Sequence, residues 1–255
     1  MGLDMVNIVC VKYGTKYNAS HVNRLYEMVR RNTSLPFLFY CLTDNGSELH
    51  PDIIVRDLDL DLNLESFWYK FCIFDSSLYI DNVPTLYFDL DTIIQNNIDP
   101  LFNRPEKSIK ISYSGELRGT DSLKWSTGVN SSIMLFIPSK TNYIRERFLI
   151  NPDYNIIQYE GVCRYLWQIH KEELDFFIPM KDFYSFIRVP QVVKDMGDPH
   201  KKYKTKQKFE TKDNLGRRGS CTGYYIPHLP VCILNGCSEA GILDQVYEFF
   251  SNYHK

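Results

Sequence analysis

The sequence contains no apolar run long enough to cross a bilayer, and its first five residues carry no positive charge. A transmembrane helix needs about 20 consecutive apolar residues, and a secretory signal peptide opens with a cationic segment. We therefore expect neither a membrane span nor a secretory leader.

Cysteine pairs at metal-binding spacing are also absent. The seven cysteines form an odd set without a CxxC pair, and Cys10, Cys41 and Cys232 lie within apolar runs, as buried free thiols do. This pattern predicts a chain without disulfides or a zinc site, in a reducing, cytoplasmic setting.

Charge is nearly balanced overall but unevenly distributed. The formal net charge is −2, whereas residues 194–218 contain nine Lys and Arg against four acids, a net of +5 that leaves −7 for the rest of the chain. Because this segment is nearly devoid of aliphatic residues, we expect a solvated, flexible loop. Its functional interpretation is contact with a polyanion.

The chain has the composition of a globular protein, with 44% hydrophobic and 24% charged residues over a length of 255. Apolar runs and helical spacing predict alternating elements, with Ser20 as the first N-cap. The expected strands lie at 6–11, 36–42, 53–55, 85–88, 132–137 and 231–234. The expected helices lie at 20–31, 67–77, 140–149, 161–170 and 243–251. This order predicts a single α/β domain, 1–255, with a mostly parallel central sheet and helices on both faces.

Two aspartates follow the expected strand at 85–88. Asp89 and Asp91 flank Leu90, and side chains two residues apart in an extended chain point to the same face. They would project together from the carboxyl end of a buried strand, the edge where α/β sheets bind ligands, while Leu90 faces the core. Neighbouring carboxylates repel unless a cation relieves them, and Mg²⁺ or Mn²⁺ bridges carboxylate and phosphate oxygens. The pair therefore predicts a divalent metal site.

A second acidic run offers two further pairs of the same spacing. Asp57, Asp59 and Asp61 follow a shorter apolar run and the charged Arg56. We interpret this run as a polar connection rather than a metal site.

Four stretches of the sequence carry a family resemblance. They are VCVKYGTKY at 9–17, FWYKF at 67–71, YFDLD at 87–91 with NIDPLF at 97–102, and GVNSSIM at 128–134. Together they resemble the nucleotide-sugar glycosyltransferases of the GT-A fold, especially small members related to the glycogenin/galactosyltransferase-like group and common in phage genomes. The resemblance implies a GT-A (Rossmann-like) fold with a donor-binding half at about 1–138 and an acceptor-side half at about 139–255.

The resemblance also implies roles for residues at matching positions. Those placed at the nucleotide-sugar are Val11, Lys12, Tyr17, Lys70, Asp89, Asn130 and Ser131. Val11 and Lys12 would border the nucleoside, and Tyr17 would contact the base or simply occupy a turn. Lys70 would counter a phosphate or hold Asp89 in place. Asn130 and Ser131 would hydrogen-bond the hydroxyls of the donor sugar, or form a turn before the next strand.

The sequence departs from the family pattern in two places. Relatives often supply a third metal ligand as a late His before a glycine, followed by Lys-Pro, whereas ILNGCSE stands here at 233–239. This leaves Asn235 or His228 as the candidate third ligand, and lysines of 194–218 as the hypothetical replacement for the phosphate-binding lysine. Where relatives read Gly-x-Asp-Arg, this chain reads GVCR from Gly161. Glu160 is then the nearest candidate base for an inverting reaction, and a retaining reaction needs none.

These observations predict a metal-dependent glycosyltransferase that moves a sugar from a nucleotide diphosphate, with UDP expected, to a hydroxyl acceptor. The basic segment and the phage-type relatives favour a hydroxylated base in phage DNA as the acceptor, and hence the host cytoplasm as the location. A glycan or protein acceptor is the alternative. A nucleotidyltransferase also pairs carboxylates with Mg²⁺, but it usually has an early glycine-rich phosphate loop, and only the stretch Tyr13-Gly14-Thr15 appears here. A non-catalytic sugar- or nucleic-acid-binding module is the third interpretation.

Overall fold

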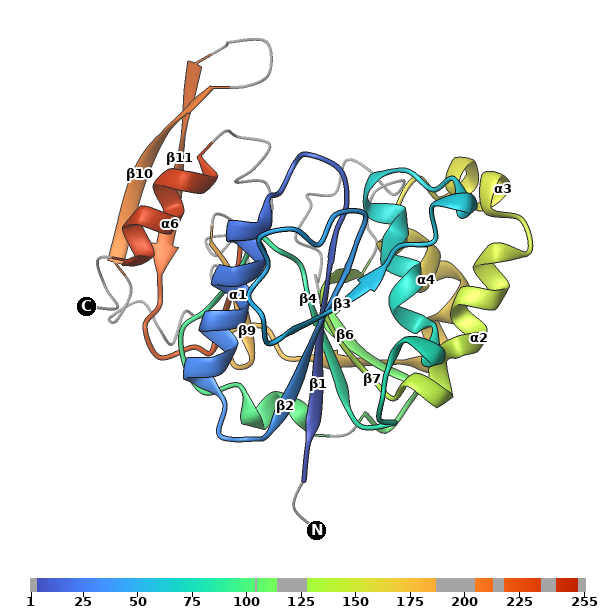
Figure 1. Ribbon diagram of the computed structural model, residues 1–255. Coiled ribbons are helices and arrows are strands. Elements are labelled where there is room, and N and C mark those ends of the chain that lie inside the picture. Colours follow the sequence, from blue (N-terminus) through green and yellow to red (C-terminus); the bar gives the residue numbers. More distant parts are fainter. Residues whose placement is uncertain are drawn as a thin grey trace.

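The computed structural model describes residues 4–103, 105–113, 128–186, 205–212, 218–234 and 242–251. Its main feature is a seven-stranded sheet in the order β3-β2-β1-β4-β7-β6-β8 (Figure 1). Every strand of this sheet except β7 runs in the same direction. The strands are β1 (Val6–Lys12), β2 (Phe37–Thr43), β3 (Ile53–Asp57), β4 (Thr85–Phe88), β6 (Ile109–Tyr113), β7 (Val129–Phe136) and β8 (Leu174–Phe177). The predicted α/β class with a mostly parallel central sheet is confirmed.

Apolar runs identify the central strands correctly because these strands are covered on both faces. All four residues of β4 are buried, as are six of the seven in β1, which is why neither run alternates with polar residues. Five of the six expected strands overlap strands of this sheet. The sixth corresponds to β12 (Val231–Ile233), which pairs with β5 (Thr92–Ile94) and β9 (Phe183–Ser185) in a smaller sheet.

Two apolar clusters lie on opposite faces of the main sheet. One contains buried residues of α1 and α6, and the other contains buried residues of α2 and α4; Figure 1 shows these helix pairs on opposite sides of the strands. The helices are α1 (Ala19–Asn32), α2 (Pro138–Leu149), α3 (Pro152–Tyr159), α4 (Val162–His170) and α6 (Leu243–Ser251). None of the helices within the described ranges is long and apolar enough to cross a membrane.

The N-cap of the first helix lies two residues before the expected one. Asn18, not Ser20, is the N-cap of α1: its side-chain Oδ1 accepts a hydrogen bond from the backbone N of Ser20 at 3.1 Å. Asn is among the best N-cap residues. The side chain of His21 completes a capping box with the backbone of Asn18.

The expected helix at 67–77 is wound differently. It consists of two 3₁₀ segments, η2 (Ser66–Phe74) and η3 (Ser76–Leu78). Seven successive residues of η2, from Trp68 to Phe74, are buried, so no polar face favours an amphipathic α-helix. Packing against the sheet and α2 therefore decides the local winding. Three shorter 3₁₀ turns are η1 (Leu60–Leu62), η4 (Asp99–Phe102) and η5 (Lys171–Glu173).

The basic segment contains a strand where a loop was expected. β10 (Thr205–Lys212) pairs antiparallel with β11 (Arg218–Tyr225) over its whole length, and Figure 1 shows this hairpin beside α6. Phe209 is buried and packs against the rings of Phe186 and Phe249, with centroids 5.6 and 5.9 Å apart. This one aromatic residue anchors the strand despite the polar composition around it. Residues 194–204 and 213–217 lie outside the described residues.

Candidate functional site

The main sheet has a topological switch point between β1 and β4. From β1 the chain proceeds outward to β2 and β3 on one side, and then returns to β4 on the other. Ligands of open α/β sheets bind in the crevice that forms outside the carboxyl ends of the strands at such a point. Lys12 ends β1, and Asp89 directly follows β4. The start of β7 lies at the same edge, because β7 runs antiparallel to β4.

Asp89, Leu90 and Asp91 connect β4 to β5 at this edge. The side chain of Leu90 is buried in the core, as expected. Leu90 and Asp91 form a turn, however, so the expectation of an extended chain with both aspartates on one face does not describe this segment. The side chain of Asp89 is 24% exposed, whereas Asp91 is 9% exposed. The two carboxylates therefore differ in their access to solvent.

A buried lysine is paired with the first aspartate. The Nζ atom of Lys70, in η2, lies 2.8 Å from Oδ1 of Asp89. It also donates to the backbone O of Ser131 at 3.2 Å and to the Oγ of Ser131 at 3.0 Å. An ammonium group has three N–H donors, and these contacts use all three. Lys70 thus fixes Asp89 against the first residues of strand β7.

Tyr87 is a second partner of Asp89, one that the sequence patterns did not single out. Its hydroxyl donates to the same Oδ1 atom of Asp89. Burial, followed by the nearby charge of Asp89, raises the pKa of Tyr87 well above its usual value, so the hydroxyl stays protonated and can donate. The i, i+2 spacing of Tyr87 and Asp89 places both on one face at the end of β4, and this was the signal available in the sequence.

Ser131, which the resemblance places at the donor sugar, contacts the lysine that is paired with Asp89. Ser131 is 4% exposed; besides Lys70, it contacts Cys163, whose Sγ lies 3.3 Å from both the N and the Oγ of Ser131. Asn130 is half-buried, and its Oδ1 accepts from the N of Ser132 at 2.8 Å. Because Asn130 and Ser131 both lie within β7, the interpretation of these residues as a turn before the strand is wrong, and their donor-binding role stays a prediction.

The other residues expected at the nucleoside lie near the end of β1. Lys12 is 5% exposed, and its Nζ is 3.8 Å from Oδ1 of Asp44, whose Oδ2 accepts from the N of Gly14 at 2.9 Å. Asp44 therefore ties the end of β1 to the loop after β2. Val11 is half-buried. Tyr17 is half-buried as well and lies edge-on to the ring of His21, with centroids 5.2 Å apart.

Comparisons with known proteins place this arrangement in context. The sequence matches no protein-family model and no curated protein, but solved structures share its fold. The galactosyltransferase LgtC, in complex with donor and acceptor sugar analogues, matches with a TM-score of 0.59 and 13% identity, over 96% of this chain and 95% of that one. An active-site mutant of LgtC gives a TM-score of 0.61 at 12% identity over the same shares. The chain has the GT-A glycosyltransferase fold.

A second GT-A structure matches over a smaller region. The glycosyltransferase GlyE of Streptococcus pneumoniae TIGR4 gives a TM-score of 0.50 at 15% identity, over 67% of this chain and 44% of GlyE. The chain thus spans under half the length of GlyE. At identities of this size the likeness establishes the GT-A fold, and the activity rests on the site. The phage-type subgroup stays a prediction.

The donor set at the GT-A switch point fits a hard divalent cation. Lys70 and Tyr87 both bind Oδ1 of Asp89, which leaves Oδ2 for another partner, and Asp91 adds a second carboxylate. Mg²⁺ is commonly bound through one or two carboxylates together with substrate phosphates. Within the described ranges, no group of three or more His, Cys, Asp or Glu residues could hold a metal. A cation here would complete its coordination with substrate and water oxygens.

Two remaining predictions concern the third ligand and the base. Asn235 lies outside the described residues, and His228 is exposed between β11 and β12. Glu160 is exposed at the end of α3, where its Oε2 forms an ion pair with Nη1 of Arg164 at 2.9 Å. The roles of all three stay predictions.

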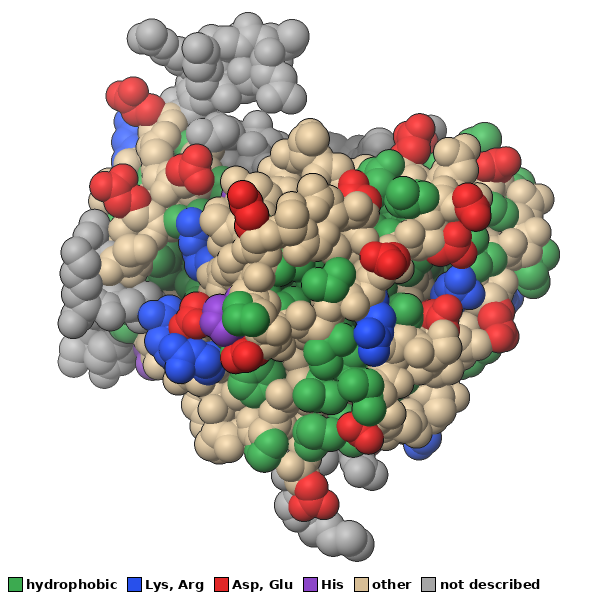
Figure 2. Space-filling view, in the orientation of Figure 1, with side chains coloured by type: hydrophobic (Ala, Val, Ile, Leu, Met, Phe, Trp, Pro, Cys, Tyr) green, Lys and Arg blue, Asp and Glu red, His purple; other side chains and the backbone are tan. Residues whose placement is uncertain are grey.

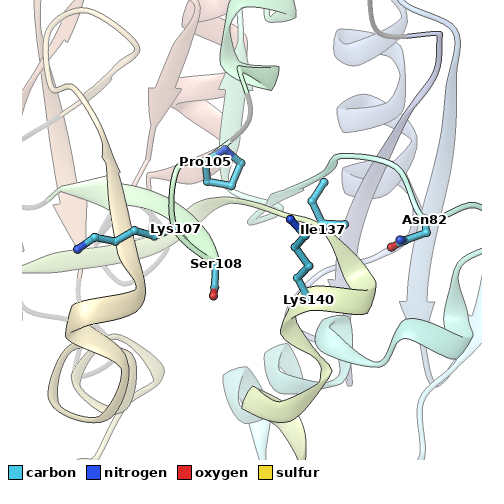
Figure 3. A pocket seen from close by; sticks show the side chains of 6 residues that line it. All are labelled: Asn82, Pro105, Lys107, Ser108, Ile137 and Lys140. Atoms are coloured by element: carbon cyan, nitrogen blue, oxygen red, sulfur yellow. The ribbon is translucent and has the colours of Figure 1, made fainter.

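A cavity of about 200 Å³ lies at the opposite edge of the main sheet (Figure 3). Its lining comes from the segments that precede β4 and β6, from the residue that follows β7 and from α2, and consists of Asn82, Pro105, Lys107, Ser108, Ile137 and Lys140. Since β4 separates this cavity from Asp89, it is not part of the candidate GT-A site.

Proposed function

We propose that the protein is a glycosyltransferase that transfers a sugar from a nucleotide diphosphate donor, with a divalent cation held by Asp89 and Asp91. The observation that carries this proposal is the fixed carboxylate of Asp89, bound through one oxygen by Lys70 and Tyr87, at the switch point of a GT-A sheet. A nucleotidyltransferase and a module that binds without catalysis are the alternatives, and the tests below distinguish both from a glycosyltransferase.

The described residues would perform two tasks in this reaction. Lys70 and Tyr87 hold Asp89 in one orientation, so no side-chain reorganisation is needed when the diphosphate binds, and this preorganisation is a large contribution to catalysis in many enzymes. Mn²⁺ or Mg²⁺ in this site would act as a Lewis acid that neutralises the charge of the departing diphosphate. The ammonium group of Lys70 is buried and stays beside Asp89, where it offsets one of the two negative charges.

UDP is the nucleotide that the family resemblance favours, and its binding gives a first prediction. With Mn²⁺ present and UDP at about 100 times its Kd, the added stability is about 2.7 kcal/mol, which corresponds to a rise in Tm of about 5–10 °C. Thermal unfolding with UDP, GDP and CMP, each with and without Mn²⁺, measures this. Equal Tm values with and without every nucleotide would contradict donor binding.

For the acceptor we propose a hydroxylated base in DNA, supported by the net charge of +5 in residues 194–218. Acidic and basic side chains are interspersed on the face shown in Figure 2, without a broad basic surface over the residues drawn in colour there. In this proposal the basic segment supplies the contacts with DNA. A glycan or protein acceptor is the alternative.

The second prediction follows from this acceptor. Displacement of condensed counterions makes DNA binding weaken steeply with salt, by about 10³-fold between about 50 and 200 mM for six phosphate contacts. Fluorescence anisotropy with duplex DNA measures this, and the triple variant Lys201→Gln, Lys202→Gln, Lys204→Gln should flatten the salt dependence. An affinity that is independent of salt would exclude DNA and leave a glycan or protein acceptor.

A further inference from the structure

The aspartate segment is fixed to three distant parts of the chain, one residue after another. The N of Asp89 donates to the O of Ser132 in β7 at 3.0 Å. The O of Leu90 accepts from the hydroxyl of Tyr247 in α6 at 2.9 Å. The O of Asp91 accepts from the N of Leu234, directly after β12, at 3.0 Å. Two of these bonds join backbone groups, whereas the middle one depends on a single side chain.

The C-terminal helix supplies that side chain from a well-packed position. Tyr247 is 6% exposed, and its neighbours Val246 and Phe250 are buried in the core. The guanidinium carbon of Arg24, on α1, lies 3.8 Å from the centroid of the Tyr247 ring. The ring of His21 lies edge-on to it at 6.0 Å. Figure 1 shows α1 and α6 close together. Tyr247 is therefore held by α1 while its hydroxyl reaches the turn between the two aspartates.

We propose that Tyr247 is a positioning residue for the metal site: its hydroxyl holds the Leu90 carbonyl and thereby sets the orientation of Asp89 and Asp91 toward a divalent cation. This inference rests on the proposed function of the same site. The turn at residues 90–91 is held at its two ends by backbone hydrogen bonds and in its middle by the hydroxyl of Tyr247. Groups that orient metal ligands from behind commonly change metal affinity by about 10–100-fold when they are removed.

Arg24 helps to hold Tyr247 in this position, because its guanidinium packs against the ring of Tyr247. Its guanidinium attracts the face of Tyr247, and its Nη1 atom is buried with no hydrogen-bond partner. The ring of Tyr247 is therefore a contact that holds the guanidinium of Arg24 in place. Without Arg24, the ring of Tyr247 would have more freedom, and the hydroxyl would hold Leu90 less firmly.

The test is the variant Tyr247→Phe, which removes one oxygen and keeps the ring. Titration of the metal-free protein with Mn²⁺, followed by electron paramagnetic resonance of the free ion, should give a Kd about tenfold higher than that of the wild type. The Mn²⁺ concentration for half-maximal donor turnover should rise by the same factor, and saturating Mn²⁺ should restore kcat. Arg24→Met should raise the Kd in the same direction by a smaller factor.

Phe250→Leu provides the matched control on the same helix. Phe250 is buried, so this variant lowers Tm through lost packing, but it removes no hydrogen bond to the Leu90 carbonyl and should leave the Mn²⁺ Kd of the folded protein unchanged. Equal Mn²⁺ affinities for Tyr247→Phe and the wild type would overturn the positioning role and leave the proposed function intact. A wild-type protein that binds no Mn²⁺ would instead overturn the proposed metal site itself.

Discussion

Replacing Asp91 with Asn is expected to lower metal-dependent turnover of the nucleotide-sugar by a factor on the order of 10³. The substitution keeps the shape of the side chain but removes one of the two negative charges offered to the cation. Because Asp91 is nearly buried, solvent screens that charge poorly, and its loss is felt strongly at the site. Steady-state hydrolysis of the donor with Mn²⁺, followed by release of the free nucleotide, measures the effect.

Asp57 offers a matched control for this substitution. It ends β3, at the same edge of the main sheet, and its side chain is exposed. Asp57→Asn removes the same charge from the same edge and should leave turnover within about twofold of the wild type, since surface charges that are exposed interact weakly. Unchanged turnover in Asp91→Asn, or an equal loss in both variants, would show that the aspartate pair does not hold the cation.

Replacing Lys70 with Met is expected to destabilise the protein by about 2–3 kcal/mol. Removing one partner of a fully buried ion pair costs about 3–5 kcal/mol, and the cost is smaller here because the side chain of Asp89 is 24% exposed. The variant also leaves the backbone O and the Oγ of Ser131 without their donor. Tm should fall by about 4–12 °C. Urea and thermal unfolding of the metal-free protein measure the change.

A double-mutant cycle separates the ion pair from the packing of the lysine stem. Asp89→Asn removes the charge that Lys70→Met leaves unpaired, so the double variant should be more stable than Lys70→Met alone, with a coupling free energy of about 1–3 kcal/mol. Additive losses in the two single variants would mean that Lys70 acts only through its contacts with Ser131. A Lys70→Met protein as stable as the wild type would contradict the pairing.

The sequence predicts the central part of this fold well because buried parallel strands need continuous apolar runs. Residues 85–88 are such a run, and β4 has those same bounds. The position of Asp89 directly after this strand was therefore predictable, as was the burial of Leu90. Periodicity was less useful for η2, since an almost fully apolar segment carries no signal that distinguishes 3₁₀ from α-helical winding.

The contacts that organise the site could not be predicted from local sequence patterns, because they join residues that are far apart in the chain. Lys70 meets Ser131 across 61 residues, and Tyr247 meets Leu90 across 157. Nothing in the local pattern around Tyr247 distinguishes it from the other apolar residues of α6, whose spacing predicts only a buried face. The burial of Ser131 and the contact of its hydroxyl with Lys70 likewise depend on how η2 and α4 pack against β7.

The most direct test of the central claim is release of free nucleotide from a panel of nucleotide-sugars, with Mn²⁺ and after chelation of the metal. The aspartate pair at the GT-A switch point predicts turnover of at least one donor, with UDP-sugars preferred, that disappears with the chelator and returns when Mn²⁺ is restored. Turnover that persists without a divalent cation, or no turnover of any donor by a protein that is folded and supplied with Mn²⁺, would contradict the assignment.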